Sequence, residues 1–118
     1  MKIIITLGFV IAISIFCLKA QSISPDEAFT HINDSITVCG VVKETHFMKK
    51  ADKYMCYLEF GDAFPNEIFS VYISDEVRRK MTYDLGKLNG KSICISGKIK
   101  LVKKKPEMTI YKESQIQK

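Results

Sequence analysis

The sequence predicts a mainly β domain: a Greek-key barrel of five short strands, with one helix before the first strand and one between the third and the fourth. Five segments alternate apolar and polar residues, which is the period of a strand with one buried face. Two other segments begin with residues that cap helices. An open sheet of five short strands would expose its edges, and closure into a barrel removes that problem.

The first twenty residues are expected to lie outside this domain. Lys2 precedes a long apolar run, and a small residue, Ala20, ends the segment. A basic start, an apolar middle and a small final residue are typical of a secretory signal peptide, which predicts an exported protein, periplasmic or extracellular, with no membrane span after cleavage. The alternative is an uncleaved membrane anchor, for which the run is slightly short. Residues 21–118 suffice for one domain with a single core.

The first helix is expected over 24–33, and the first strand follows it over 35–47. Ser24 can cap the helix, and Glu27, three residues later, completes a capping box. Apolar residues then fall on alternate positions of the strand. Gly40 stands in the middle of that pattern and suggests a bulge or a sharp coil, which small barrels need at their corners.

The second and third strands are expected over 54–60 and 68–74. A polar break at 48–53 precedes them, and turn-forming residues at 61–67 separate them. Alternation places one cysteine, Cys56, on the inward face beside leucine and phenylalanine, so we expect it to be a buried thiol of the core.

The second helix is expected over 74–85, where acidic residues of the first turn precede basic ones, the order that the helix dipole favours. The fourth strand is expected over 92–101, with Leu101 on its inward face. Three lysines and a proline then turn the chain into a short fifth strand at 107–116. Three strands, a helix and two further strands are the order of the oligonucleotide/oligosaccharide-binding barrel, the OB-fold.

Several segments carry a resemblance that covers nearly all of residues 21–118. They are "EAFTHI" before the first strand, "TVCGVV" within it, "YLEFGDAFPNEIFSVYI" through strands two and three, and "KSICISGKIKL" followed by "KPEMTIY". In their spacing the chain resembles small secreted or periplasmic bacterial OB-fold proteins, often described as nucleic-acid-binding or tRNA-anticodon-domain-like. Asp34 and Ser35 depart from an expected glycine–lysine pair, and Lys104 departs from an expected glycine in the last hairpin. The resemblance implies the fold, and a fold does not fix a function.

Two of the cysteines are candidates for a disulfide. Cys39 and Cys94 lie on the faces opposite the apolar stripes of the first and fourth strands, which are neighbours in an OB barrel. In an oxidising compartment they could form a cross-strand disulfide. The alternative is two buried thiols beneath the first helix, because the sequence does not fix the register of the strands.

The sequence contains no recognisable catalytic or metal-binding pattern. It has no nucleophile elbow, no H-E-x-x-H and no glycine-rich phosphate loop, and its carboxylates are scattered. The cysteines form no C-x-x-C, and only two histidines accompany them. We therefore expect a binding module and not an enzyme, with no cofactor and no metal.

The tyrosines and lysines define the candidate ligand-binding site. Ligands of OB barrels lie across strands two and three, flanked by the loops between strands one and two and between strands four and five. Tyr57 and Tyr72 point outward from the two central strands and could stack on bases, each contact being worth about 1–3 kcal/mol. Lysines that could follow phosphates lie in the two flanking loops: Lys49, Lys50 and Lys53 in the first, Lys103, Lys104 and Lys105 in the second.

This layout predicts weak binding of single-stranded DNA or RNA with little sequence preference. The alternative is a periplasmic domain that interacts with a protein or a glycan and does not bind nucleic acid. Glu59 and Glu67 lie near the proposed groove and would repel phosphate, and the net charge of +5 is only mildly basic. Lysines also occur in surface hairpins because they block edge pairing, and tyrosines in strands because they pack well on a pleated surface.

Overall fold

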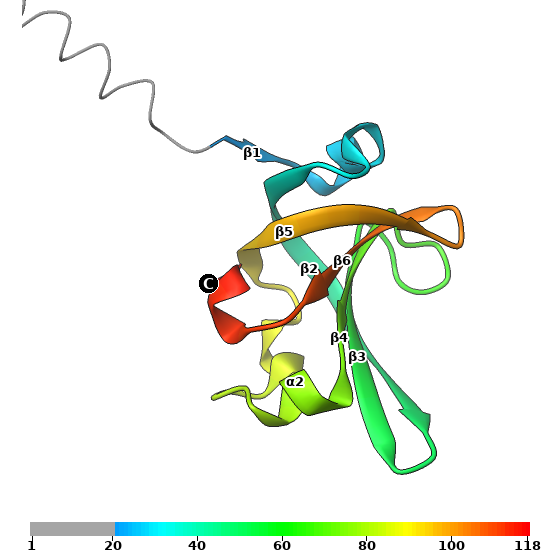
Figure 1. Cartoon of the computed structure of the whole chain (residues 1–118), viewed down its shortest axis with the longest axis vertical. Coiled ribbons are helices and arrows are strands. Elements are labelled where there is room, and N and C mark those ends of the chain that lie inside the picture. The colour runs from blue at the N-terminus through cyan, green and yellow to red at the C-terminus, as the bar shows by residue number, and fades with distance from the viewer. Residues whose placement is uncertain (1–20) are drawn as a thin grey trace, which may run out of the picture.

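The computed structural model describes residues 21–118, and the predicted signal peptide at 1–20 lies outside them. The domain is mainly β (Figure 1). Its elements are β1 (Ser22–Ile23), the 3₁₀ helix η1 (Pro25–His31), β2 (Ser35–Lys50), β3 (Lys53–Phe60), β4 (Phe69–Ile73), α2 (Asp75–Arg79), η2 (Leu85–Leu88), β5 (Ser92–Val102), β6 (Lys105–Ile110), η3 (Glu113–Gln115) and β7 (Ile116–Gln117). Within this part of the chain, no helix has both the length and the apolar character needed to cross a membrane.

All seven strands belong to one sheet that is partly closed into a ring. β2 pairs with β3 and β3 with β4, both antiparallel, and β4 then pairs in parallel with β6. β6 pairs with β5, and β5 returns to β2, again antiparallel. Outside this ring, β1 adds to β2 and β7 adds to β5. The sequence predicted five strands, and it missed β1 and β7 because two-residue strands show no period.

The long strand β2 takes part in the ring twice. Its first half, Ser35–Val41, pairs with β5, and its second half pairs with β3. The register is irregular between Val42 and Glu44, where the strand passes from one partner to the other. The predicted bulge at Gly40 is therefore wrong in position, because Gly40 pairs regularly with β5.

The absence of a side chain at Gly40 instead allows η1 to pack closely on β2. A Cβ atom at this position would lie 2.6 Å from Cγ of Pro25, the first residue of η1. Such a distance is too short for two carbon atoms, so any side chain here would force η1 away from the strand.

The inward faces of the ring form one apolar core, as the alternation predicted. Its members are fully or almost fully buried and come from every strand of the ring, among them Val38, Leu58, Phe60, Phe69, Val71, Ile95, Ile99, Met108 and Ile110. Cys56 is a buried free thiol in this core, as expected, and its burial raises the pKa of the thiol to about 12. The inward placement of Leu101 is wrong: its side chain is 51% exposed, because β5 has left the core there and runs out into a hairpin.

The turns and helices differ from the predicted boundaries. The polar break at 48–53 is mostly strand, since β2 and β3 form one hairpin whose turn is only Ala51–Asp52. The second helix is α-helical only over Asp75–Arg79, and Oγ of Ser74 accepts a hydrogen bond from the Val77 N–H at 3.3 Å. The predicted fifth strand at 107–116 is interrupted by η3, which separates β6 from β7.

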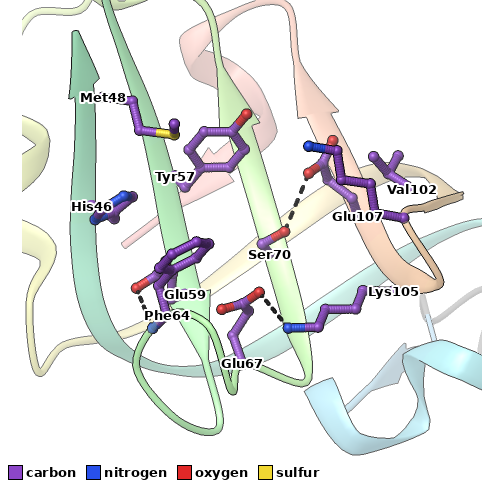
Figure 2. A pocket seen from close by; sticks show the side chains of 11 residues that line it. His46, Met48, Tyr57, Glu59, Phe64, Glu67, Ser70, Val102, Lys105 and Glu107 are labelled. Atoms are coloured by element: carbon purple, nitrogen blue, oxygen red, sulfur yellow. Dashed lines mark hydrogen bonds and ion pairs between the residues drawn. The ribbon is translucent and has the colours of Figure 1, made fainter.

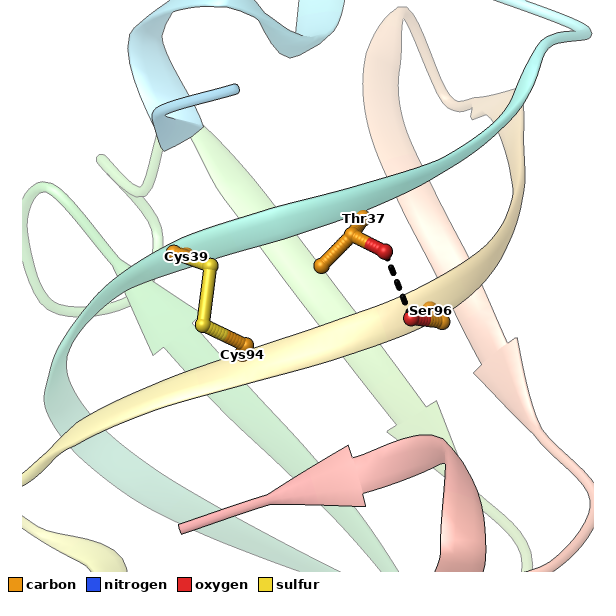
Figure 3. Close-up of a disulfide and its surroundings, with 4 residues drawn as sticks. All are labelled: Thr37, Cys39, Cys94 and Ser96. Atoms are coloured by element: carbon orange, nitrogen blue, oxygen red, sulfur yellow. Dashed lines mark hydrogen bonds between the residues drawn. A yellow bond between two sulfur atoms is a disulfide. The ribbon is translucent and has the colours of Figure 1, made fainter. Parts of the chain in front are cut away.

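The first half of β2 and its partner β5 meet in a seam that closes the ring, defined here as residues 35–41 paired with 92–98 (Figure 3). Cys39 and Cys94 are directly opposite each other in this seam and form a disulfide, with their Cα atoms 4.0 Å apart. Two residues along, the hydroxyl oxygens of Thr37 and Ser96 are hydrogen-bonded at 2.7 Å. Of the two alternatives for these cysteines, the structure contains the disulfide.

Candidate binding site

The two tyrosines are neighbours on the outer face of β3 and β4. Tyr57 and Tyr72 are cross-strand partners, and their ring centroids lie 5.2 Å apart with the planes tilted by 50°. Both rings are half-buried and lie outside the core. Burial raises the pKa of the Tyr57 hydroxyl, and the neighbouring Glu107 raises it further.

Five of the six predicted lysines are exposed at the tips of two hairpins. The β2–β3 hairpin carries Lys49, Lys50 and Lys53, and the β5–β6 hairpin carries Lys103 and Lys104 at its turn. Both hairpins extend to the right in Figure 1, the β5–β6 tip above and the β2–β3 tip below, with β3 and β4 between them. The tips thus flank the tyrosine-bearing strands from two sides.

The turn of the β5–β6 hairpin has an uncommon backbone. Lys103 and Lys104 both have positive φ, at 51° and 70°. This left-handed region favours glycine, so a lysine is unusual at either position. The turn is formed by Lys103 and Lys104 alone, with a lysine at a position where the resemblance described above predicts glycine.

The sixth lysine, Lys105, is held by the protein itself. Its Nζ donates to Oε1 of Glu67 at 2.9 Å and to the carbonyl oxygen of Pro65. A lysine in these contacts does not present a free charge to a phosphate. Lys105 thus differs from the other five predicted lysines, because its ammonium group is bound within the protein.

A pocket of about 260 Å³ lies between the tyrosine pair and the β5–β6 hairpin (Figure 2). It is lined by aromatic, charged and apolar side chains of β2, β3, the β5–β6 hairpin and the loop at 61–68, together with Ser70 of β4. Those that matter for its chemistry are His46, Tyr57, Glu59, Phe64, Glu67 and Glu107.

The loop at 61–68 folds back over the outer face of the sheet and forms one wall of the pocket. The backbone N–H of Phe64 donates to Oε1 of Glu59 at 3.1 Å. The Phe64 ring stacks on His46 of β2, with the centroids 5.0 Å apart and the planes 6° from parallel. This contact leaves an aromatic surface beside a carboxylate.

The carboxylates of the pocket are unusually buried. Glu59, which belongs to β3, is 1% exposed, and Glu67, in the loop before β4, is 9% exposed. Burial raises the pKa of Glu59, and it also raises the pKa of Glu107, whose Oε1 is 3.4 Å from the Ser70 hydroxyl. One oxygen of Glu67, Oε2, is buried without any hydrogen-bond partner.

The register of the sheet brings these acidic side chains together. Glu59 is the cross-strand partner of Ser70, and Ser70 is the cross-strand partner of Glu107. The sequence pointed to Glu59 and Glu67 as residues near the groove but not to Glu107, His46 or Phe64. Alternation alone shows that Glu107 points outward, whereas its alignment with Glu59 depends on the pairing of β4 with β6, which the sequence does not reveal.

Over residues 21–118, no three metal-ligating side chains gather into a group that could hold a metal ion. Comparison with known proteins finds no family model that matches the chain, no similar curated protein and no similar solved structure. The chemistry of the pocket therefore has to be read from its own residues.

Proposed function

We propose that the partly closed ring is an OB-fold and that the chain is an exported binding module, not an enzyme. The order of pairing supports this: β2, β3, β4, β6 and β5 follow one another around the ring, and α2 lies between β4 and β5. In an OB-fold the ligand face is formed by the second and third strands, here β3 and β4, between the two hairpins. That face carries Tyr57, Tyr72 and the pocket.

The ligand that this face fits best is a segment of another protein. The observation that carries this conclusion is the group of carboxylates in the pocket: Glu59 and Glu67, which are buried, and Glu107, which is half-buried. Carboxylates repel the phosphates of nucleic acid, and the repulsion is strongest where burial limits screening by solvent. A peptide backbone carries no charge and meets no such repulsion, and neutral or basic side chains of the peptide can pack on the tyrosine pair and the Phe64 ring.

Single-stranded nucleic acid is the second candidate, and one observation favours it. Five exposed lysines stand at the two hairpin tips, on either side of Tyr57 and Tyr72. A strand could follow the tips with its phosphates and stack its bases on the tyrosines, without entering the acidic pocket.

Two probes separate these candidates. A phage-displayed library of random nonapeptides is selected on the purified domain, and a fluorescein-labelled fifteen-residue oligothymidine is titrated by anisotropy at low and high salt. We expect selected peptides to bind and to lose roughly tenfold in affinity on Tyr57→Ala, because a buried aromatic contact is worth more than about 1 kcal/mol. Tyr111→Ala is the matched control, since Tyr111 follows the end of β6, does not line the pocket and is 77% exposed.

The opposite pattern would overturn the preference for a protein segment. In that pattern the peptide selection fails, and oligothymidine binds with an affinity that falls steeply as the salt concentration rises. Replacement of Lys103 and Lys104 by alanine would then make the affinity depend less on salt. Glycan binding, nearly indifferent to salt but lost on Tyr57→Ala, would also overturn it. If neither a peptide nor the oligonucleotide binds, this face is not the binding surface proposed.

A further inference from the structure

We propose that the pocket recognises one arginine side chain, supplied by the protein segment that lies across β3 and β4. This inference rests on the function proposed above and adds to it the chemical group that the pocket takes. Three features support it: an unpartnered buried carboxylate oxygen, an excess of acidic groups, and aromatic walls of suitable size.

The unpartnered oxygen is Oε2 of Glu67. Glu67 is nine-tenths buried, and Figure 2 shows its carboxylate pointing into the pocket, with Lys105 bound to one side only. Lys105 satisfies Oε1, whereas Oε2 has no donor. A buried charged oxygen without a donor is costly, so an N–H group from a ligand would gain a strong, charge-assisted hydrogen bond here.

The neighbouring groups leave the pocket with an excess of negative charge. Glu59 and Glu107 join Glu67 in the lining, and two lysines, Lys103 and Lys105, oppose them. Burial raises the pKa of Glu59 and of Glu107 although each accepts one hydrogen bond, so the partners that they have do not offset the cost of burying their charge. A guest cation would stabilise those ionised forms, since it brings the missing positive charge into the pocket.

The walls suit a guanidinium group better than an ammonium group. The rings of His46 and Phe64 stand almost parallel, and Tyr57 faces the pocket from β3. Arginine stacks its planar head on aromatic rings and donates two parallel hydrogen bonds to a carboxylate, neither of which lysine can do. The volume of about 260 Å³ is below the range of about 300–1,000 Å³ that is usual for drug-sized ligands, so one side chain is the appropriate guest.

The test compares two small ligands that differ in one charge. Nα-acetyl-arginine amide and Nα-acetyl-citrulline amide have nearly the same shape, but the ureido group of citrulline is neutral. Each is titrated into the ¹⁵N-labelled domain, and the amide resonance of Phe64 is followed because this N–H bonds to Glu59. We expect the arginine derivative to shift this resonance and to bind at least tenfold more tightly than the citrulline derivative, and its binding to weaken with salt.

A pair of variants locates the binding in the pocket. Glu67→Gln keeps the shape of the side chain and removes its charge, so we expect at least a tenfold loss of affinity for the arginine derivative. Glu76→Gln makes the same charge change on α2, where the side chain is 81% exposed, and we expect no loss. The ligand comparison itself needs no variant, so it still decides the question if Glu67→Gln fails to fold.

The results separate this inference from the proposed function. Equal binding of the two derivatives, or none by either, would overturn the arginine site. Selected peptides that bind through Tyr57 but contain no required arginine would overturn it too, while the peptide-binding role of the face would stand. Failure of the peptide selection together with salt-dependent binding of oligothymidine would refute both.

Discussion

Polar side chains have different surroundings in two regions of the molecule. One region is the seam between β2 and β5, and the other is the pocket on the opposite part of the sheet. In the seam, Cys39 is bonded to Cys94 and Thr37 is hydrogen-bonded to Ser96. In the pocket, carboxylates outnumber lysines, and one oxygen of Glu67 has no partner. The polar side chains of the seam are therefore paired with one another, whereas the pocket contains a carboxylate oxygen without a donor.

This difference supports the proposal that the seam stabilises the fold and that the pocket binds a ligand. Buried polar groups in folded proteins almost always have partners, so an exception needs an explanation. A missing partner in a solvent-accessible pocket is explained if a ligand provides it. The comparison therefore predicts that changes in the seam alter stability without altering binding, and that changes in the pocket can improve stability while they damage binding.

The largest effect is expected from loss of the disulfide. Cys39 and Cys94 are 55 residues apart in the sequence, and a crosslink that closes a loop of that length stabilises a protein by about 4 kcal/mol in the chain-entropy estimate. We expect the double variant Cys39→Ser, Cys94→Ser to lose about that much free energy of unfolding, measured by urea denaturation. Binding at the pocket should persist in conditions where the variant stays folded.

Dithiothreitol provides the control for this prediction. It should lower the urea midpoint of the wild-type chain to that of the double variant and leave the double variant unchanged, because within residues 21–118 the remaining thiol, Cys56, is buried in the core. A double variant as stable as the oxidised wild type would show that the seam does not depend on its crosslink.

A smaller effect is expected at Gly40, where the seam meets η1. A Cβ atom there would lie 2.6 Å from Cγ of Pro25, a ring carbon with little freedom to move, so Gly40→Ala should cost about 1–3 kcal/mol. Gly97→Ala is the matched control in β5. Its Cβ would meet the sulfur of Met108 at 2.9 Å, and this flexible side chain can shift. Thermal unfolding should rank Gly97→Ala as the milder change, and the reverse order would contradict the packing argument.

The smallest effect on stability is expected from a change in the pocket. This change should stabilise the protein, whereas the two changes in the seam should destabilise it. Burial raises the folded-state pKa of Glu59 above its unfolded value of about 4.3, so the stability that Glu59 contributes is complete below that pH and is lost as the pH rises through the folded pKa. Glu59→Gln does not titrate and can still accept the hydrogen bond from the Phe64 N–H. We therefore expect the variant to be more stable than wild type at neutral pH.

The pH dependence checks that explanation. Melting temperatures of both proteins, measured from pH 4 to pH 8, should diverge as the pH rises and converge at the acid end. An equal difference at every pH would mean that Glu59 acts through packing and not through its charge. A variant less stable throughout would contradict the prediction outright.

The sequence predicted the inner surface of the ring well and the outer surface poorly. Alternation identifies inward residues such as Leu58 and Val71 because burial repeats every second position along a strand. Alternation also predicted that Tyr57 and Tyr72 point outward, whereas only the register of β3 and β4 shows that they are cross-strand partners. If the first and fourth strands are neighbours, Cys39 and Cys94 can face each other, and the register places them directly opposite.

The pocket was not predictable for a different reason. Its acidic row depends on the parallel pairing of β4 with β6, and its aromatic wall depends on how the loop at 61–68 folds back to bring Phe64 onto His46. Neither leaves a periodic trace in the sequence. The ion pair of Lys105 with Glu67 was not predictable either. A run of three lysines gives no sign that one of them forms an ion pair while the other two stay exposed.

The two short strands at the ends of the described chain, β1 and β7, both attach to the strands of the seam. In Figure 1 they lie on the side of the molecule away from the two hairpin tips. A surface, a bead or a fluorescent fusion joined through either end would therefore leave the pocket facing the solution. The same geometry lets the domain be displayed in an array with the pocket of every copy facing the solution.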